Sequence, residues 1–373
     1  MAKNYETLEY MHNSIYSNGL KNQSYSERKT KIYFSTPDTG INEYTGILLI
    51  IAGYGGNPSS NVYKKMREQF ADKYNLITIQ CDYFGSEFMQ DSEDINIPQI
   101  DSKTLKRVFS NDEIKEIYNQ DKLDFNRLIE IGSKYNITLD VKENLSAEYF
   151  GNFNDMGVMQ ALDNIAAVLK VMSIVYENGY QFNTKKVILY GQSQGAYLAY
   201  LCNRFCPTLF SHIIDNSSWI YPQYLLSNRY LSYTIGNLTL NVEFEYLAKQ
   251  MDVNNKILDL NYLYSNFEND CEITSYHGVT DNLISHIEKR SFCSKVKNCA
   301  YNEITEEKID GEIFKSTNHG LDANFLNLFD YTIKNKEFKK DTFLDLSENV
   351  IIKAYEKDYY IDYKNILPLF TVI

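Results

Sequence analysis

Apolar positions along the chain fall into short, almost continuous runs separated by segments with helical spacing. Such runs occupy residues 46–52 (GILLIIA), 76–81 (LITIQC) and 187–189 (VIL). Runs of this length are typical of strands buried inside a parallel sheet. Residues 61–74 and 155–172 lie between them, and the second segment carries apolar side chains at spacings of three and four, which predicts an amphipathic helix. The order strand, helix, strand predicts right-handed parallel crossovers.

The most informative motif, Gly191-Gln192-Ser193-Gln194-Gly195, follows the third run without a spacer and precedes a segment of helical character, 196–204. A strand that turns into a helix so abruptly crowds the residue at the turn, so small neighbours are required on either side of Ser193. The hydroxyl would stand at a helix N-terminus, where main-chain N–H groups favour negative charge. A Gly-Ser-Gly turn without chemistry is the alternative. In this context G-x-S-x-G is typical of a nucleophile elbow, so Ser193 is the predicted nucleophile.

A glycine-rich segment, Gly53-Tyr54-Gly55-Gly56, follows the first apolar run. Acyl-transfer enzymes with a nucleophile elbow stabilise the oxyanion with two main-chain N–H groups. One comes from the residue after the serine and one from a loop after an early central strand. We therefore predict Gln194 as one donor and Tyr54 as the other, with Gly55 next in order. No Gly-Lys-Ser/Thr follows, which excludes a P-loop, and a plain turn is the remaining alternative.

The candidate general base is His319, the only one of the five histidines that follows the last predicted core strand, 311–315. An imidazole titrates near physiological pH and can accept a proton from a serine hydroxyl. The other four lie before the first core strand, inside a strand, ahead of the candidate acid and on a helix: His12, His212, His277 and His286.

The candidate acid is Asp281, in the loop after a predicted strand at 272–276. Asp215, at the end of a predicted strand at 210–215, is the alternative. Asp322 is a weaker candidate, because a carboxylate at the start of a helix caps that helix.

The order nucleophile, acid and base along the chain is met by Ser193, Asp281 and His319, and with the elbow context it resembles the α/β-hydrolase superfamily. The resemblance covers roughly residues 30–337. It implies an α/β fold with a mostly parallel central sheet, helices on both faces and a site at the carboxyl ends of the strands. Within the superfamily the chain is similar to a bacterial branch without an assigned substrate.

Five segments make up the predicted domain organisation. Residues 1–30 are a polar N-terminal lead-in, expected to be weakly structured or to form a short edge element, and 31–337 form the hydrolase domain. Insertions at 86–150 and 217–268, the second rich in aromatic residues, are too long for plain loops and are predicted to form a cap. Residues 341–373 alternate in polarity and predict a β-hairpin extension, added at a sheet edge or used for association between copies.

Composition and charge limit the possible binding partners and the expected cellular location. The 373 residues have a formal net charge of −12, which argues against a nucleic-acid partner. The first residues lack the apolar segment of a secretory signal, and no apolar run approaches bilayer length, so we expect a cytoplasmic protein. The six cysteines include no C-x-x-C pair, and the motifs imply neither a metal nor an organic cofactor.

These observations predict a serine hydrolase, and within that class a carboxylic-ester hydrolase that forms a covalent acyl-enzyme with a small-molecule or glycan acyl ester. An O-acyltransferase acting on a sugar and a serine peptidase are alternatives with the same first step. A non-catalytic binding protein that retains the fold is the third. Two differences from the usual superfamily pattern leave the substrate class open. Ala52 occupies a position that usually holds histidine. Gln192 and Gln194 flank the serine, whereas a small or aromatic residue is common at one of these positions.

Overall fold

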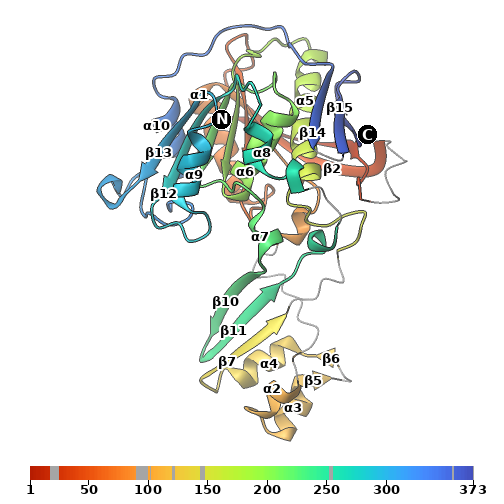
Figure 1. Cartoon of the computed structure of the whole chain (residues 1–373), viewed down its shortest axis with the longest axis vertical. Helices are drawn as coiled ribbons and strands as arrows, with labels where there is room; N and C mark the ends of the chain where they lie inside the picture. The colour runs from red at the N-terminus through yellow and green to blue at the C-terminus, as the bar shows by residue number, and fades with distance from the viewer. Residues whose placement is uncertain are drawn as a thin grey trace. The chain divides into compact units, whose positions relative to one another are not determined.

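The computed structural model describes residues 1–16, 25–89, 100, 102–119, 122–142, 148–251, 255–354 and 357–372. Its central element is an eight-stranded sheet (Figure 1). In spatial order the strands are β1 (Lys3–His12), β2 (Tyr25–Thr36), β4 (Leu76–Cys81), β3 (Gly46–Ile51), β8 (Val187–Gln192), β9 (His212–Asn216), β12 (Glu272–Gly278) and β13 (Cys299–Ile304). The β1–β2 and β2–β4 pairs are antiparallel and all the others are parallel. The predicted α/β fold with a mostly parallel sheet is confirmed.

Helices cover both faces of this sheet (Figure 1). On one face, α1 (Asn61–Tyr74) and α10 (Phe325–Ile333) pack on a cluster that includes Leu48 and Ile50 of β3. The other helices in the same part of the chain as the large sheet are α5 (Val158–Glu177), α6 (Gln194–Phe205), α8 (Leu260–Tyr264) and α9 (His286–Cys293). Three 3-10 turns accompany them: η1 (Ser86–Phe88), η4 (Asn255–Ile257) and η5 (Glu306–Lys308).

Helix α5 is long and apolar enough to cross a membrane by length and composition alone. However, 83% of its most apolar window is buried inside the protein, where it contacts α6 and the strands β1, β2 and β4. We therefore interpret α5 as a core helix.

The N-terminal segment forms an edge element, which is one of the two possibilities expected for residues 1–30, and not a weakly structured lead-in. The strands β1 and β2 pair in antiparallel register from Lys3 opposite Thr36 to His12 opposite Tyr25, and they form one edge of the sheet. Most of β1 is exposed or half-buried. An edge strand with one solvated face needs few apolar residues, so the polar composition did not decide between these two possibilities.

The prediction of a last core strand at 311–315 is wrong, because the last strand of the large sheet is β13. Residues 311–315 form a turn around Asp310, whose Oδ1 accepts main-chain hydrogen bonds from Glu312, Ile313 and Phe314 at 2.9, 2.7 and 3.0 Å. Phe314 is buried in the core cluster. Its apolar side chain therefore reports burial of a turn and not a paired strand.

The chain divides into two compact units. The first contains Met1–Met89, Phe150–Pro222 and Asp252–Ile373, and the second contains Gln90–Tyr149 and Gln223–Met251. The second unit takes its residues from within both predicted insertions, whereas residues 252–268 belong to the unit of the large sheet. The predicted role of these insertions as a cap stays a prediction.

The second unit has its own small sheet. The strands are β10 (Arg229–Ile235), β11 (Leu238–Phe244) and β7 (Ile137–Lys142), in that spatial order. The strand β11 alternates buried and half-buried residues and pairs in parallel with β7, which joins the two stretches of the unit. The other elements are α2 (Ser102–Lys106), α3 (Asn111–Ile117), β5 (Tyr118–Asn119), β6 (Lys122–Leu123), α4 (Phe125–Gly132), α7 (Gln223–Leu226) and η3 (Leu247–Gln250).

The C-terminal segment forms a separate three-stranded antiparallel sheet and not only the predicted hairpin. Its strands are β14 (Asn349–Ala354), β15 (Lys357–Asp362) and β16 (Leu369–Val372). It is fastened to the end of α6, because Tyr363 Oη donates to the main-chain oxygen of Phe205 at 2.9 Å and Phe370 lies against the Phe205 ring.

Candidate active site

Ser193 stands at a sharp turn between β8 and α6, as the elbow motif predicts. Its backbone has φ 54° and ψ −122°, a conformation that side chains larger than hydrogen rarely adopt. A Cβ at Gly195 would lie 2.1 Å from the main-chain oxygen of Ile51, and one at Gly191 would lie 2.4 Å from the nitrogen of Ala196. Both glycines are therefore needed for the turn to close against the sheet.

The structure brings the three predicted side chains together. Ser193 Oγ lies 2.7 Å from His319 Nε2, and His319 Nδ1 lies 2.8 Å from Asp281 Oδ2. A carboxylate only accepts hydrogen bonds, so the Nδ1 of His319 carries the proton. Its Nε2 is then free to accept the proton of the serine hydroxyl. The histidine side chain keeps 21% exposure, whereas that of Asp281 is fully buried.

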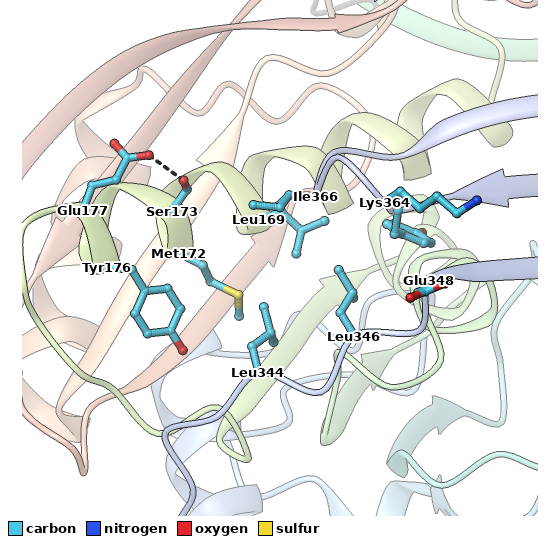
Figure 2. A pocket seen from close by; sticks show the side chains of 11 residues that line it. Leu169, Met172, Ser173, Tyr176, Glu177, Leu344, Leu346, Glu348, Lys364 and Ile366 are labelled. Carbon is cyan, nitrogen blue, oxygen red and sulfur yellow. Dashed lines mark hydrogen bonds between the residues drawn. The ribbon is translucent and has the colours of Figure 1, made fainter.

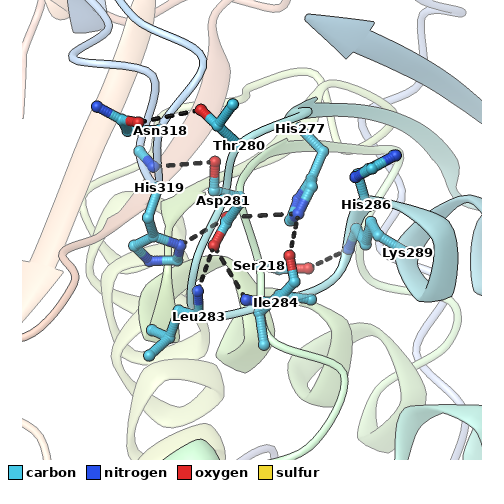
Figure 3. A network of polar contacts seen from close by, with 12 residues as sticks. Ser218, His277, Thr280, Asp281, Leu283, Ile284, His286, Lys289, Asn318 and His319 are labelled. Carbon is cyan, nitrogen blue, oxygen red and sulfur yellow. Dashed lines mark hydrogen bonds and ion pairs between the residues drawn. The ribbon is translucent and has the colours of Figure 1, made fainter.

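The Asp281 carboxylate is surrounded by hydrogen-bond donors (Figure 3). Its Oδ1 accepts from the main-chain N–H groups of Leu283 and Ile284 at 2.8 and 3.0 Å. His277 Nε2 lies 3.3 Å from Oδ2 and 3.0 Å from the main-chain oxygen of Ile284. Burial alone would raise the pKa of Asp281, but the contact with His319 and the Ile284 N–H outweigh it and hold this pKa below its usual value. The arrangement keeps the carboxylate charged.

The alternative acid, Asp215, has a different partner. Its Oδ2 lies 2.7 Å from Lys289 Nζ, and both side chains are fully buried. Tyr200 Oη donates to the same carboxylate at 2.9 Å, and the main-chain N–H of Ser218 donates at 2.8 Å. Burial would raise the pKa of Asp215, but Lys289 lowers it below its usual value. The carboxylate that contacts His319 is that of Asp281.

The expected capping role of Asp322 is wrong. Asp322 has a positive φ of 43° and lies ahead of α10, whose N-terminus is capped by the side chain of Asn324.

The glycine-rich segment lies directly against the elbow. A Cβ at Gly53 would be 3.4 Å from the Cβ of Ser193. Tyr54 and Gly55 follow in a turn that is closed by the Gly56 N–H on the Gly53 oxygen at 3.1 Å. Gln194 is the first residue of α6, and the first N–H groups of a helix have no acceptor within the helix. The segments that contain all three predicted oxyanion donors are thus next to the serine.

Two polar residues that the sequence analysis missed hold the loop of His319 in place. Ser217 Oγ accepts the Gly320 N–H, and Asn216 Nδ2 donates to the Gly320 oxygen, each at 3.1 Å. Asn216 is the last residue of the buried strand β9 and Ser217 follows it directly, at the carboxyl edge of the sheet. Polar residues at that edge were the available signal, but they carry no motif.

A pocket of about 420 Å³ lies elsewhere in the same unit (Figure 2). Its walls are the last turns of α5, the chain that leads into the C-terminal sheet and the connection between β15 and β16. Its lining includes Leu169, Met172, Leu344, Leu346 and Ile366. None of the predicted site residues lines this pocket.

The strand order and the site define the class of this protein. The serine follows the fifth strand of the large sheet along the chain, the acid the seventh and the histidine the eighth. The elbow conformation and the contacts among the three side chains complete the pattern. The protein has the fold of the α/β-hydrolases.

The chain belongs to the family described as protein of unknown function (DUF2920), whose model matches residues 26–228. The matched part contains Ser193 and the glycine-rich segment, whereas Asp281 and His319 lie beyond it. Comparison with curated protein sequences gives no match.

Two solved structures illustrate the similarity. Est1E from Butyrivibrio proteoclasticus with bound ferulic acid has a TM-score of 0.43 and 13% identity, over 82% of this chain and 95% of that one. Esterase 2 of Thermogutta terrifontis, phosphorylated by paraoxon, has a TM-score of 0.43 and 11% identity, over 83% and 87%.

Proposed function

We propose that this protein is a serine hydrolase that cleaves carboxylic esters through a covalent acyl-enzyme. One observation carries the proposal: a serine on a strained elbow lies 2.7 Å from an imidazole that is itself oriented by a buried carboxylate. A serine hydroxyl is a weak nucleophile at neutral pH and needs an adjacent base. A serine with only a structural role does not require contact with a histidine and aspartate pair such as His319 and Asp281.

The first half-reaction follows from these contacts. Ser193 Oγ attacks the ester carbonyl carbon while its proton passes to His319 Nε2. The charge of Asp281 stabilises the imidazolium that forms. The carbonyl oxygen becomes an oxyanion, which the N–H groups of Gln194 and Tyr54 stabilise. Collapse expels the alcohol, which takes the proton from His319, and leaves the acyl group on the serine.

Water completes the cycle by the same route. It attacks the acyl carbon and gives one proton to His319, and collapse returns that proton to Ser193 Oγ as the carboxylic acid leaves. Discharge to a sugar hydroxyl would use the same geometry, so an added alcohol acceptor separates hydrolysis from acyl transfer.

Active-site labelling tests the proposal directly. A fluorophosphonate probe should label the wild-type protein at the peptide that contains Ser193, and p-nitrophenyl acetate should be hydrolysed. Ser193→Ala should lose both signals with little change in melting temperature. Ser173→Ala is the matched control, because Ser173 lies on α5 with its hydroxyl bonded to Glu177. Absence of labelling, or labelling that survives Ser193→Ala, would contradict the mechanism.

A further inference from the structure

A buried chain of side-chain hydrogen bonds joins the two segments that supply the proposed oxyanion donors. Gln194 Nε2 donates to Gln160 Oε1 at 2.7 Å. Gln160 Nε2 donates to Asn154 Oδ1 at 2.8 Å, and Asn154 Nδ2 donates to Tyr54 Oη at 2.7 Å. We call these four side chains the amide bridge. Its three amide side chains belong to fully buried residues.

One main-chain carbonyl fixes the direction of every bond in the amide bridge. Gln160 Nε2 also faces the main-chain oxygen of Phe84 at 3.2 Å, and a carbonyl oxygen can only accept. The amide nitrogen of Gln160 must therefore point that way, which turns its oxygen toward Gln194. Asn154 must then present its oxygen to Gln160 and its nitrogen to Tyr54. The bridge has a single hydrogen-bonding arrangement and not two equivalent ones.

The ends of the bridge are the residues whose main-chain N–H groups are the proposed donors. Tyr54 lies on the loop after β3 and Gln194 on the first turn of α6, so the covalent chain does not set the spacing of the two groups. The Tyr54 ring also packs against Trp219, with 5.8 Å between ring centroids. Side-chain contacts thus fix the positions of Tyr54 and Gln194. An oxyanion site depends on such preorganisation, since an error of about 1 Å can cost about 100-fold in rate.

We propose that Gln160 and Asn154 are positioning residues that hold the N–H groups of Tyr54 and Gln194 at the separation required by the oxyanion. The inference rests on the proposed function and extends it to residues that do not touch the substrate. Loss of a purely structural network would lower the folding stability of the protein without a specific effect on the transition state. Loss of a positioning network weakens binding of the transition state more than binding of the substrate.

The test uses Gln160→Met, which keeps the length of the side chain and removes both bridge bonds, and Tyr54→Phe, which removes only the hydroxyl. Asn164→Leu is the matched control, because Asn164 is buried on the same helix but donates to the main-chain oxygen of Gln160 and not to the bridge. For both bridge variants kcat for p-nitrophenyl acetate should fall about 10- to 100-fold with KM within about twofold of wild type. The inhibition constant of a trifluoromethyl ketone, which forms an oxyanion on the serine, should rise by the same factor.

Two further outcomes separate this inference from the proposed function. The second-order rate of fluorophosphonate labelling at Ser193 should fall in parallel, and it can be measured in the absence of ester turnover. If Gln160→Met does not fold, Tyr54→Phe decides the question, because it leaves the three buried amides in place. Unchanged kcat and labelling in a folded bridge variant, or losses equal to those of Asn164→Leu, would overturn the positioning role while the serine mechanism stands. A wild-type protein that is not labelled at all would overturn both.

Discussion

At the scale of single residues, two aspartates with buried side chains have different roles: Asp215 lies on β9, and Asp281 lies in the loop after the neighbouring strand β12. Asp281 accepts from two main-chain N–H groups and from His319, so its charge is satisfied and directed at the imidazole. Asp215 neutralises Lys289 in a fully buried pair. Asp281 is therefore the acid of the proposed mechanism, whereas Asp215 stabilises the fold.

Asparagine at each position should separate these roles. Asp281→Asn should lower kcat by about 10⁴-fold and leave the fold intact, because the amide cannot stabilise an imidazolium and favours the wrong tautomer. Asp215→Asn should instead cost about 3–5 kcal/mol of stability, because it leaves the Lys289 charge buried without its partner. Ester turnover and urea unfolding of both variants provide the comparison.

A second change gives the internal control. Adding Lys289→Met to Asp215→Asn should recover most of the lost stability, because the unpaired charge is removed. If Asp215→Asn proves the more damaging to turnover in folded protein, the acid assignment moves to the earlier strand.

At the scale of elements, the elbow is a three-way contact among β3, β8 and α6. Gly195 brings the first turn of α6 within van der Waals distance of the carbonyl groups of Ile51 and Ala52, next to the glycine-rich segment. The same close approach thus builds the elbow and brings the two proposed donor segments together.

Gly195→Ala should therefore damage activity as well as stability. Its methyl group would overlap the Ile51 oxygen, and overpacking of this kind costs about 1–3 kcal/mol. Displacement of the two donor segments should lower the rate of fluorophosphonate labelling about 100-fold. Gly179→Ala is the control, since its Cβ meets no atom within 4 Å and only its φ of +77° is unfavourable. It should cost about 1–2 kcal/mol and leave labelling unchanged.

Elements that are buried on both faces could be predicted from the sequence, and partly exposed ones could not. The apolar runs of β3, β4 and β8 and the glycines of the elbow left direct patterns, so the site around Ser193 was found by its local sequence. The edge strand β1 is polar, so its composition left a weakly structured lead-in and an edge element equally open. The segment around Phe314 was wrongly predicted as a strand, because a turn can also bury an aromatic side chain. Contacts such as Gln160 with Gln194 depend on how distant segments meet, which no local pattern records.

At the scale of the whole molecule, buried histidines couple stability to pH. His212 is fully buried at the start of β9, with Nε2 3.2 Å from Thr274 Oγ1. Burial lowers its pKa from 6.5 to about 4, so it is neutral at pH 7 despite Glu272 being 3.6 Å away. The unfolded chain binds this proton near pH 6.5 and the folded chain only near pH 4. Stability is therefore lost as the pH falls through this window.

Between pH 7 and 5 the wild-type protein should lose on the order of 2 kcal/mol more stability than His212→Gln, in which the titrating group is absent. Glutamine can still donate to Thr274, so the fold should be kept. Asp155, whose burial raises its pKa to about 6, acts in the opposite direction but is present in both proteins and cancels in the comparison. Urea unfolding at the two pH values measures the difference, and equal slopes would mean that His212 does not titrate as described.

The apolar helix α5 has a consequence for how the protein is made. During translation, β1, β2 and β4 are synthesised before α5, whereas α6, which also packs against α5, is synthesised after it. A nascent chain that stalls short of Gln194 would therefore display a segment whose length and composition resemble those of a membrane span. Incomplete translation products, and not the finished protein, are the species that chaperones and insertion machinery should capture.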